Sequence, residues 1–148
     1  MCLLHKYTCI FFLAAGIFIP LSVYGNSQIG ILEIENNVIS VELARTKKEH
    51  ARGLMHRKSL GKYDGMLFIY ANKNILCMWM KNTYIPLTVL FIDERGYVLE
   101  MQDMIPNTEK PHCSANKVRF ALELDTKWLK STNITLKSRI TNLDSVDD

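Results

Sequence analysis

The residues from Ile75 to Thr83, ILCMWMKNT, combine a thiol, two thioethers and an indole with a lysine, an amide and a hydroxyl. Soft sulfur ligands of this kind suit Cu(I), so a metal site is one interpretation. In a strand, however, Cys77 would face away from Met78 and Met80, because successive side chains alternate between the two faces. Methionine is also a common gap-filler in protein cores. We therefore predict a core strand here and no metal site.

The polar end of this run has two interpretations. Asn82 and Thr83 directly follow an apolar strand, where such residues often hydrogen-bond a turn. Alternatively, they form the rim of a binding site with Trp79 as its apolar wall. Arg52 and Arg57 flank the sequence GLMH and would suit an anion, although solvated arginines at a helix end are more common. The sequence leaves both interpretations open.

Other chemistry finds little support in the sequence. His50, His56 and His112 lack the spacing of zinc ligands, and no C-x-x-C accompanies them. A nucleophilic Cys113 would need a histidine brought from elsewhere in the fold. The chain has no G-x-S-x-G, no phosphate loop and no paired-carboxylate motif. We predict no cofactor.

The first 25 residues have the layout of a secretory signal peptide. A positively charged start is followed by an apolar run, Ile10 to Ile19, and by Val23 and Gly25 at the −3 and −1 positions of a cleavage site. This predicts residues 1–25 as signal peptide and 26–148 as one domain, with a periplasmic or secreted location. The alternative is an uncleaved N-terminal anchor, which would then be the only contact with a membrane.

Export would leave Cys77 and Cys113 in a compartment where disulfides persist. Whether the two form a bridge stays open, because sequence alone cannot bring their Cα atoms close enough. The formal net charge of +3 is mild, and the charges are interspersed along the chain. We therefore expect no nucleic-acid partner.

The hydrophobic pattern predicts strands with short connections. Two alternating runs, 31–35 and 38–45, suggest a hairpin turning at Asn36-Asn37. Thr46 and Glu49 form a capping box that should begin a short helix, with Gly53 near its end. Asp125 should cap a second short helix. Further strands are predicted over 66–70, 75–80, 87–92, 97–101 and 118–124, and a last one over 136–143. Together they predict an α+β, mainly β, single small domain with a bent, barrel-like, mostly antiparallel sheet and two short helices.

These motifs resemble a known family. The runs TKKEHARGLMHRKSL, DGMLFIY, CMWMKNTYIPLTVLFID with GYV, and HCSANKVRFALEL are similar to domain of unknown function 192, a family of uncharacterised secreted or membrane-anchored bacterial and archaeal proteins. The resemblance covers about residues 30–141. It implies a small β-rich domain behind a signal peptide, with no agreed activity, cofactor or substrate. The family-like positions are Arg52, Gly53, Leu54, Met55, Arg57, Gly65, Met66, Phe68, Trp79, Met80, Asn82, Thr83, Pro86, Leu87, Phe91, Asp93, Gly96 and Glu123.

One position departs from the family pattern. Members commonly have aspartate after Pro-Leu, where this chain has Thr88. If that carboxylate were a metal ligand or a general base, the activity here would be impaired or changed. The alternative is a structural role for the position.

Once turn glycines and core residues are set aside, we select six of the remaining positions as candidate ligand-binding residues: Arg52, Arg57, Trp79, Asn82, Thr83 and Glu123. The set has no evident nucleophile or acid–base pair, so it fits binding better than catalysis. We predict a non-catalytic binding module for a small polar ligand or a peptide in the cell envelope. One alternative is an envelope hydrolase using Glu123, with or without a bound metal. Another is a structural or interaction module that recruits an envelope protein through an exposed sheet edge.

Overall fold

The computed structural model describes residues 28–146. The predicted signal peptide, residues 1–25, lies outside the described residues. Between Gln28 and Val146, no helix is long and apolar enough to cross a membrane.

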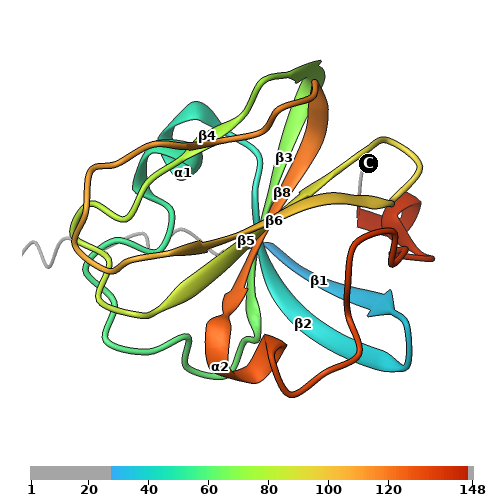
Figure 1. Ribbon diagram of the computed structural model, residues 1–148, viewed down its shortest axis with the longest axis horizontal. Helices are drawn as coiled ribbons and strands as arrows, with labels where there is room; N and C mark the ends of the chain where they lie inside the picture. The colour runs from blue at the N-terminus through green and yellow to red at the C-terminus, as the bar shows by residue number, and fades with distance from the viewer. Residues whose placement is uncertain (1–27, 147–148) are drawn as a thin grey trace, which may run out of the picture.

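One curled six-stranded sheet carries the fold (Figure 1). Its spatial order is β1 (Gln28–Ile34), β2 (Asn37–Ala44), β3 (Gly65–Asn74), β8 (Val118–Asp125), β5 (Leu87–Ile92) and β6 (Val98–Met104). Four of the five strand pairs are antiparallel, as predicted. The β2–β3 pair is parallel, because α1 (Lys47–Arg52) and the loop after it return the chain to the start of the next strand.

A second, much smaller sheet pairs β4 (Cys77–Met78) with β7 (His112–Cys113). The predicted strand 75–80 is thus reduced to two residues outside the main sheet. The predicted alternation still holds, because Met78 and Met80 are buried whereas Cys77 and Trp79 are exposed.

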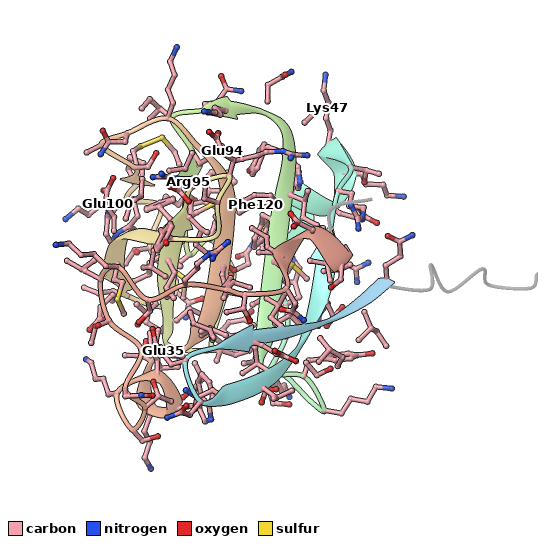
Figure 2. The ribbon with its side chains drawn as sticks, turned by 90° about the vertical axis from the view of Figure 1, so that its right-hand side faces the viewer. Glu35, Lys47, Glu94, Arg95, Glu100 and Phe120 are labelled. Carbon is pink, nitrogen blue, oxygen red and sulfur yellow. A yellow bond between two sulfur atoms is a disulfide. The ribbon has the colours of Figure 1, made fainter. Side chains whose placement is uncertain are left out.

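The main sheet buries both of its faces. The first core contains Leu67, Leu90 and Phe120 and is closed by α2 (Thr126–Leu129), the C-terminal segment and η1 (Leu143–Val146). Figure 2 labels Phe120, which is 1% exposed. The second core contains Met66 and Phe91 on the other face. Burial on both faces explains why β3 and β5 read as continuous apolar runs.

Local signals set several boundaries. The Thr46 hydroxyl accepts a hydrogen bond from the Glu49 N–H, and the Glu49 carboxylate accepts one from the Thr46 N–H, so the predicted capping box begins α1. Gly53, with φ +45°, ends it. Asp125 caps α2 through the Trp128 N–H. The β1–β2 turn sits one residue earlier than predicted, because Glu35 takes the positive φ of +51°.

The predicted last strand, 136–143, is wrong. This segment forms only two isolated bridges, Ile140 to Ile34 and Arg139 to Tyr97. It crosses from the β5–β6 hairpin to β1, and Figure 1 shows it in red beside the yellow hairpin. It therefore links the two edges of the curled sheet at one end without closing a hydrogen-bonded barrel.

Candidate functional site

Two segments cover the second-core face of the sheet. Leu54 and Leu60 belong to the loop after α1, whereas Met80 and Ile85 belong to the segment that contains β4. The backbone N–H of His56 donates to the carbonyl of Asn82 at 2.7 Å. This hydrogen bond joins the two segments, so it brings the family-like sequences GLMHR and WMKNT together.

The turn at Asn82 and Thr83 is held by its own hydrogen bonds. Asn82 has φ +50°, a left-handed conformation that asparagine adopts more readily than most residues. The Thr83 hydroxyl donates to the Lys81 carbonyl at 3.2 Å, and the Thr83 carbonyl accepts from the Asn107 N–H at 3.1 Å. The turn therefore uses the Thr83 hydroxyl internally, whereas the Asn82 side chain is exposed and forms no hydrogen bond with another described residue.

Trp79 lies two residues before this turn and is 45% exposed. The ammonium group of Lys81 lies 5.4 Å from the centroid of its ring, within the range of a cation–π interaction. The same ammonium group pairs with Glu109 at 3.2 Å. One part of the indole is therefore covered and the rest is open to solvent.

The two arginines have different surroundings. Arg52 is exposed at the end of α1, and its side chain has no partner among the described residues. Arg57 forms a two-pronged ion pair with the buried carboxylate of Glu42 on β2. Hydrogen bonding to Glu42 raises the pKa of Arg57 above its usual value. Arg57 is therefore engaged inside the protein, and only Arg52 is available to a ligand.

Glu123 lies on β8 and is 4% exposed. Its cross-strand neighbours are Met66 on β3 and Val89 on β5, both in the second core. Burial raises the pKa of Glu123 to about 8, with no hydrogen bond or charge to offset it. The pKa of Tyr70 is also raised, mainly because Tyr70 is buried and to a smaller extent because of the negative charge of Glu123. In the described chain, Glu123 is thus a buried carboxyl group without a partner.

The carboxyl oxygens of Glu123 still reach solvent. Every side-chain nitrogen or oxygen of residues 28–146 that is fully shielded from solvent has a hydrogen-bond partner. The Glu123 oxygens have none, so they are not fully shielded, and the small exposed fraction of this residue includes them. A small part of the surface of this carboxyl group is therefore accessible to solvent.

The six predicted residues thus divide into two sets. Arg52, Trp79 and Asn82 present exposed groups, whereas Arg57, Thr83 and Glu123 are directed inward. Sequence reasoning missed Glu42, which sits in an alternating run and reads as a solvent-facing residue. Its burial follows from the loop packed over β2, and no sequence pattern signalled that path.

Cys77 and Cys113 form a disulfide, which answers the question left open by the sequence. They are directly opposite each other on β4 and β7, with Cα atoms 4.0 Å apart. Two-stranded ribbons are marginal on their own. The bridge therefore fastens the segment that carries Trp79 and Asn82.

A hollow of about 320 Å³ lies elsewhere, between the β5–β6 hairpin and the C-terminal segment. The guanidinium groups of Arg95 and Arg139 each lie 5.4 Å from the centroid of the Tyr97 ring in its wall. Figure 2 labels Glu94 and Arg95 at this hairpin. None of the six predicted residues lines it.

A family model for DUF192, described as uncharacterized ACR, matches residues 30–142. The chain belongs to the DUF192 family. No curated protein matches it. A candidate transcription regulator from Sinorhizobium meliloti 1021 is similar in structure, with a TM-score of 0.73 and 28% identity over 76% of this chain and 92% of that one. A protein of unknown function from Novosphingobium aromaticivorans DSM 12444 is also similar in structure, with a TM-score of 0.71. The two are 28% identical, and the match covers 82% of this chain and 89% of that one.

Thr88, where the family resemblance led us to expect aspartate, faces the first core, away from Glu123. Its cross-strand neighbours are Leu124 and Asp103. The Thr88 hydroxyl donates to the Asp103 carboxylate at 2.7 Å, and that carboxylate also pairs with Lys130 at 2.7 Å. Both contacts lower the pKa of Asp103, that with Lys130 more strongly. In this DUF192 chain the position therefore supports a polar cluster on the opposite face of the sheet.

Proposed function

We propose that this DUF192 protein is a non-catalytic binding module of the cell envelope, for a small polar ligand or a peptide. The observation that carries the proposal is that three candidate side chains are exposed, those of Arg52 at the end of α1 and of Trp79 and Asn82 on the segment that contains β4; we name this set the WN surface. It offers a guanidinium group, part of an indole face and a side-chain amide, all exposed. Aromatic stacking with a few directed hydrogen bonds is the usual chemistry of polar-ligand recognition.

The backbone beneath this surface is already ordered. The His56–Asn82 and Asn107–Thr83 hydrogen bonds hold the turn from two sides, and the disulfide fastens the strand before it. A preorganised surface loses less conformational entropy when a ligand binds. This rigidity supports binding at the turn.

The disulfide also supports an exported location. Disulfides persist in oxidising compartments such as the periplasm and the extracellular space, and are rare in the cytosol. Together with the signal-like sequence of residues 1–25, it favours a periplasmic or secreted protein.

A hydrolase remains the second candidate, because Glu123 has the raised pKa that a general acid needs. A hydrolytic site also needs a second group, but Asp125, two positions along β8, caps α2, and Glu42, two strands away, is held by Arg57. This favours binding over catalysis.

An interaction module is the third candidate. Ile29, Ile31 and Val38 are 50–70% exposed on the β1–β2 hairpin and would suit an apolar patch on an envelope protein. The outer edge of β1 is partly occupied, because Asn142 hydrogen-bonds the backbone of Ile31 and Glu33.

The transcription-regulator description of the S. meliloti neighbour finds no support in the mild net charge of +3.

A thermal-shift screen tests the proposal with sugars, amino acids and organic anions on the oxidised protein. A ligand at 100 times its dissociation constant stabilises a protein by about 2.7 kcal/mol, which raises Tm by several degrees at this size. Asn82→Gly should abolish the shift, since glycine keeps the positive φ and removes only the amide. Lys137→Gly, at another left-handed position, is the matched control. A shift retained in Asn82→Gly, or no shift with any compound, contradicts binding at this surface.

A further inference from the structure

We propose that the hollow of about 320 Å³ between the β5–β6 hairpin and the C-terminal segment binds a small zwitterion of the α-amino acid type. The ligand carboxylate contacts the guanidinium groups of Arg95 and Arg139, and the ligand ammonium group contacts the carboxylate of Asp144. The inference goes beyond the proposed function, because none of the residues of the WN surface lines this hollow.

Backbone hydrogen bonds hold the two walls of the hollow together. The Val98 N–H donates to the Ser138 carbonyl at 2.9 Å, and the Ile140 N–H donates to the Gly96 carbonyl at 2.9 Å. Gly96 has φ +86°, and a Cβ atom there would lie 2.5 Å from the Ile140 carbonyl oxygen, so only glycine allows this approach. Figure 1 shows the red C-terminal segment beside the yellow hairpin. Because these walls are already ordered, a ligand that enters costs little backbone entropy.

Two arginines, one from each wall, converge on a single aromatic ring. The guanidinium groups of Arg95 and Arg139 each lie 5.4 Å from the centroid of the Tyr97 ring, so their separation is at most twice this distance. The Arg139 Nε donates to the Arg95 carbonyl at 2.9 Å, which orients the side chain and uses one of its five N–H donors. Arg95 shares its charge with Asp93 at 3.3 Å. Since a guanidinium fork matches a carboxylate, Arg139 is the main anchor for a ligand carboxylate, with Arg95 beside it.

Negative charge lines the same hollow. Glu94 is one acidic residue of the lining, and it pairs with Lys73 on β3. Asp144, in the first turn of η1, is the other, and it is exposed. A ligand with negative charge alone would be attracted by Arg139 and repelled by Asp144, whereas a ligand that carries both charges interacts favourably with both. The mixed signs therefore favour a zwitterion over a simple anion.

The size and lining of the hollow indicate a small ligand with a short side chain. Its volume of about 320 Å³ is at the lower end of the range of roughly 300–1,000 Å³ that is usual for ligand sites. The side chains of Ile140 and Leu143 are buried, so they contribute little apolar surface, whereas Arg139, Thr141 and Asp144 are exposed. The Thr141 hydroxyl adds a group that can both donate and accept. L-alanine and L-serine are therefore suitable probes.

Calorimetric titration of the oxidised protein with L-alanine and L-serine tests the site, with propionate and n-propylamine as analogues that each carry one of the two charges. We expect saturable binding of the amino acids and about tenfold weaker binding of both analogues. Arg139→Gln and Asp144→Asn should each lower the amino-acid affinity about tenfold, as the loss of a hydrogen bond to a charged group implies. Lys48→Gln and Glu35→Gln make the same changes of charge at exposed positions outside the hollow and should keep the affinity. Equal binding of propionate, retained affinity in Arg139→Gln, or no binding of either amino acid overturns the proposal.

A second measurement needs no variant and separates this site from the WN surface. In ¹⁵N-labelled wild-type protein, L-alanine should shift the NMR signal of the Arg139 Nε–H and leave that of the Trp79 indole N–H in place. A shifted Trp79 signal with an unchanged Arg139 signal overturns the proposal and supports binding at the WN surface instead. Unchanged signals from both residues also overturn it. The Arg139→Gln variant should still fold, because the bridge between Tyr97 and Arg139 is a backbone interaction.

Discussion

Glu42 and Glu123 face the same side of the sheet, two strands apart, with Met66 between them. At a strand spacing of about 4.8 Å, their backbones are roughly 10 Å apart. Both are almost fully buried, yet Arg57 neutralises Glu42 while Glu123 has no cationic partner among residues 28–146. This asymmetry distinguishes a structural carboxylate from a candidate functional one.

The first prediction concerns the pH dependence of stability. The pKa of Glu123 is raised from 4.5 to about 8 by burial, so the folded state binds more protons than the unfolded state between these values. The contribution of Glu123 to stability is therefore fully present below about pH 4.5 and is lost as the pH rises to 8. Relative to Glu123→Gln, the wild type should lose on the order of 4 kcal/mol between pH 5 and pH 9. Urea unfolding at several pH values measures this.

Glu35→Gln, at an exposed turn residue, is the control and should keep the wild-type pH profile. A difference between wild type and Glu123→Gln that stays constant with pH would show that the carboxyl group is already ionised in the folded protein near neutral pH.

The second prediction concerns the Arg57–Glu42 pair. Arg57→Met removes two hydrogen bonds to a buried carboxylate and should destabilise the protein by about 2–3 kcal/mol. Replacing both residues, with Glu42→Gln as the second change, should cost less than the sum of the single changes by at least about 1 kcal/mol. Chemical denaturation of all four proteins gives this coupling energy. Additive effects would mean that the pair does not hold the loop on the sheet.

The third prediction concerns Gly65 at the start of β3. A Cβ atom there would lie 2.1 Å from the carbonyl oxygen of Glu123, which is backbone and cannot move aside. Gly65→Ala should therefore destabilise the protein by more than about 3 kcal/mol or prevent folding. Gly61→Ala is the control: nothing lies within 4 Å of its Cβ position, and only its φ of +69° costs about 1 kcal/mol. Similar midpoints for the two variants in thermal unfolding would disprove the close approach of β3 and β8.

The fourth prediction concerns the disulfide. Cys77 and Cys113 are 36 positions apart, and closing a loop of that length stabilises a protein by about 3–4 kcal/mol in the chain-entropy account. The double variant Cys77→Ser/Cys113→Ser should lose about this amount in urea unfolding. Hydrogen exchange should also speed up at the Ser114 N–H, which donates to the Leu76 carbonyl. Unchanged exchange there would show that β4 and β7 stay paired without the bridge.

Local interactions explain which features could be predicted from the sequence. The capping box of Thr46 and Glu49 and the Asp125 cap involve residues three positions apart, so neighbouring letters contain the whole interaction. The apolar runs of β3 and β5 likewise indicate strands buried on both faces.

The remaining features depend on distant parts of the chain. Glu42 is buried because a loop more than ten residues later packs over β2, and an alternating run cannot show this. The disulfide requires β4 and β7 to meet, and the C-terminal segment takes bridges instead of a strand because it must cross between β1 and the β5–β6 hairpin. Glu123 was selected through the family resemblance, and its missing partner became visible only in three dimensions.

Fluorescence of Trp79 tests the central claim, ligand binding at the WN surface, most directly. The chain has two tryptophans, so Trp128→Phe leaves Trp79 as the single reporter. Titration of this protein with a compound that raises Tm should change the Trp79 emission in a saturable way, and Asn82→Gly should remove the change. A compound that raises Tm while the Trp79 emission stays constant would place binding elsewhere and contradict the account.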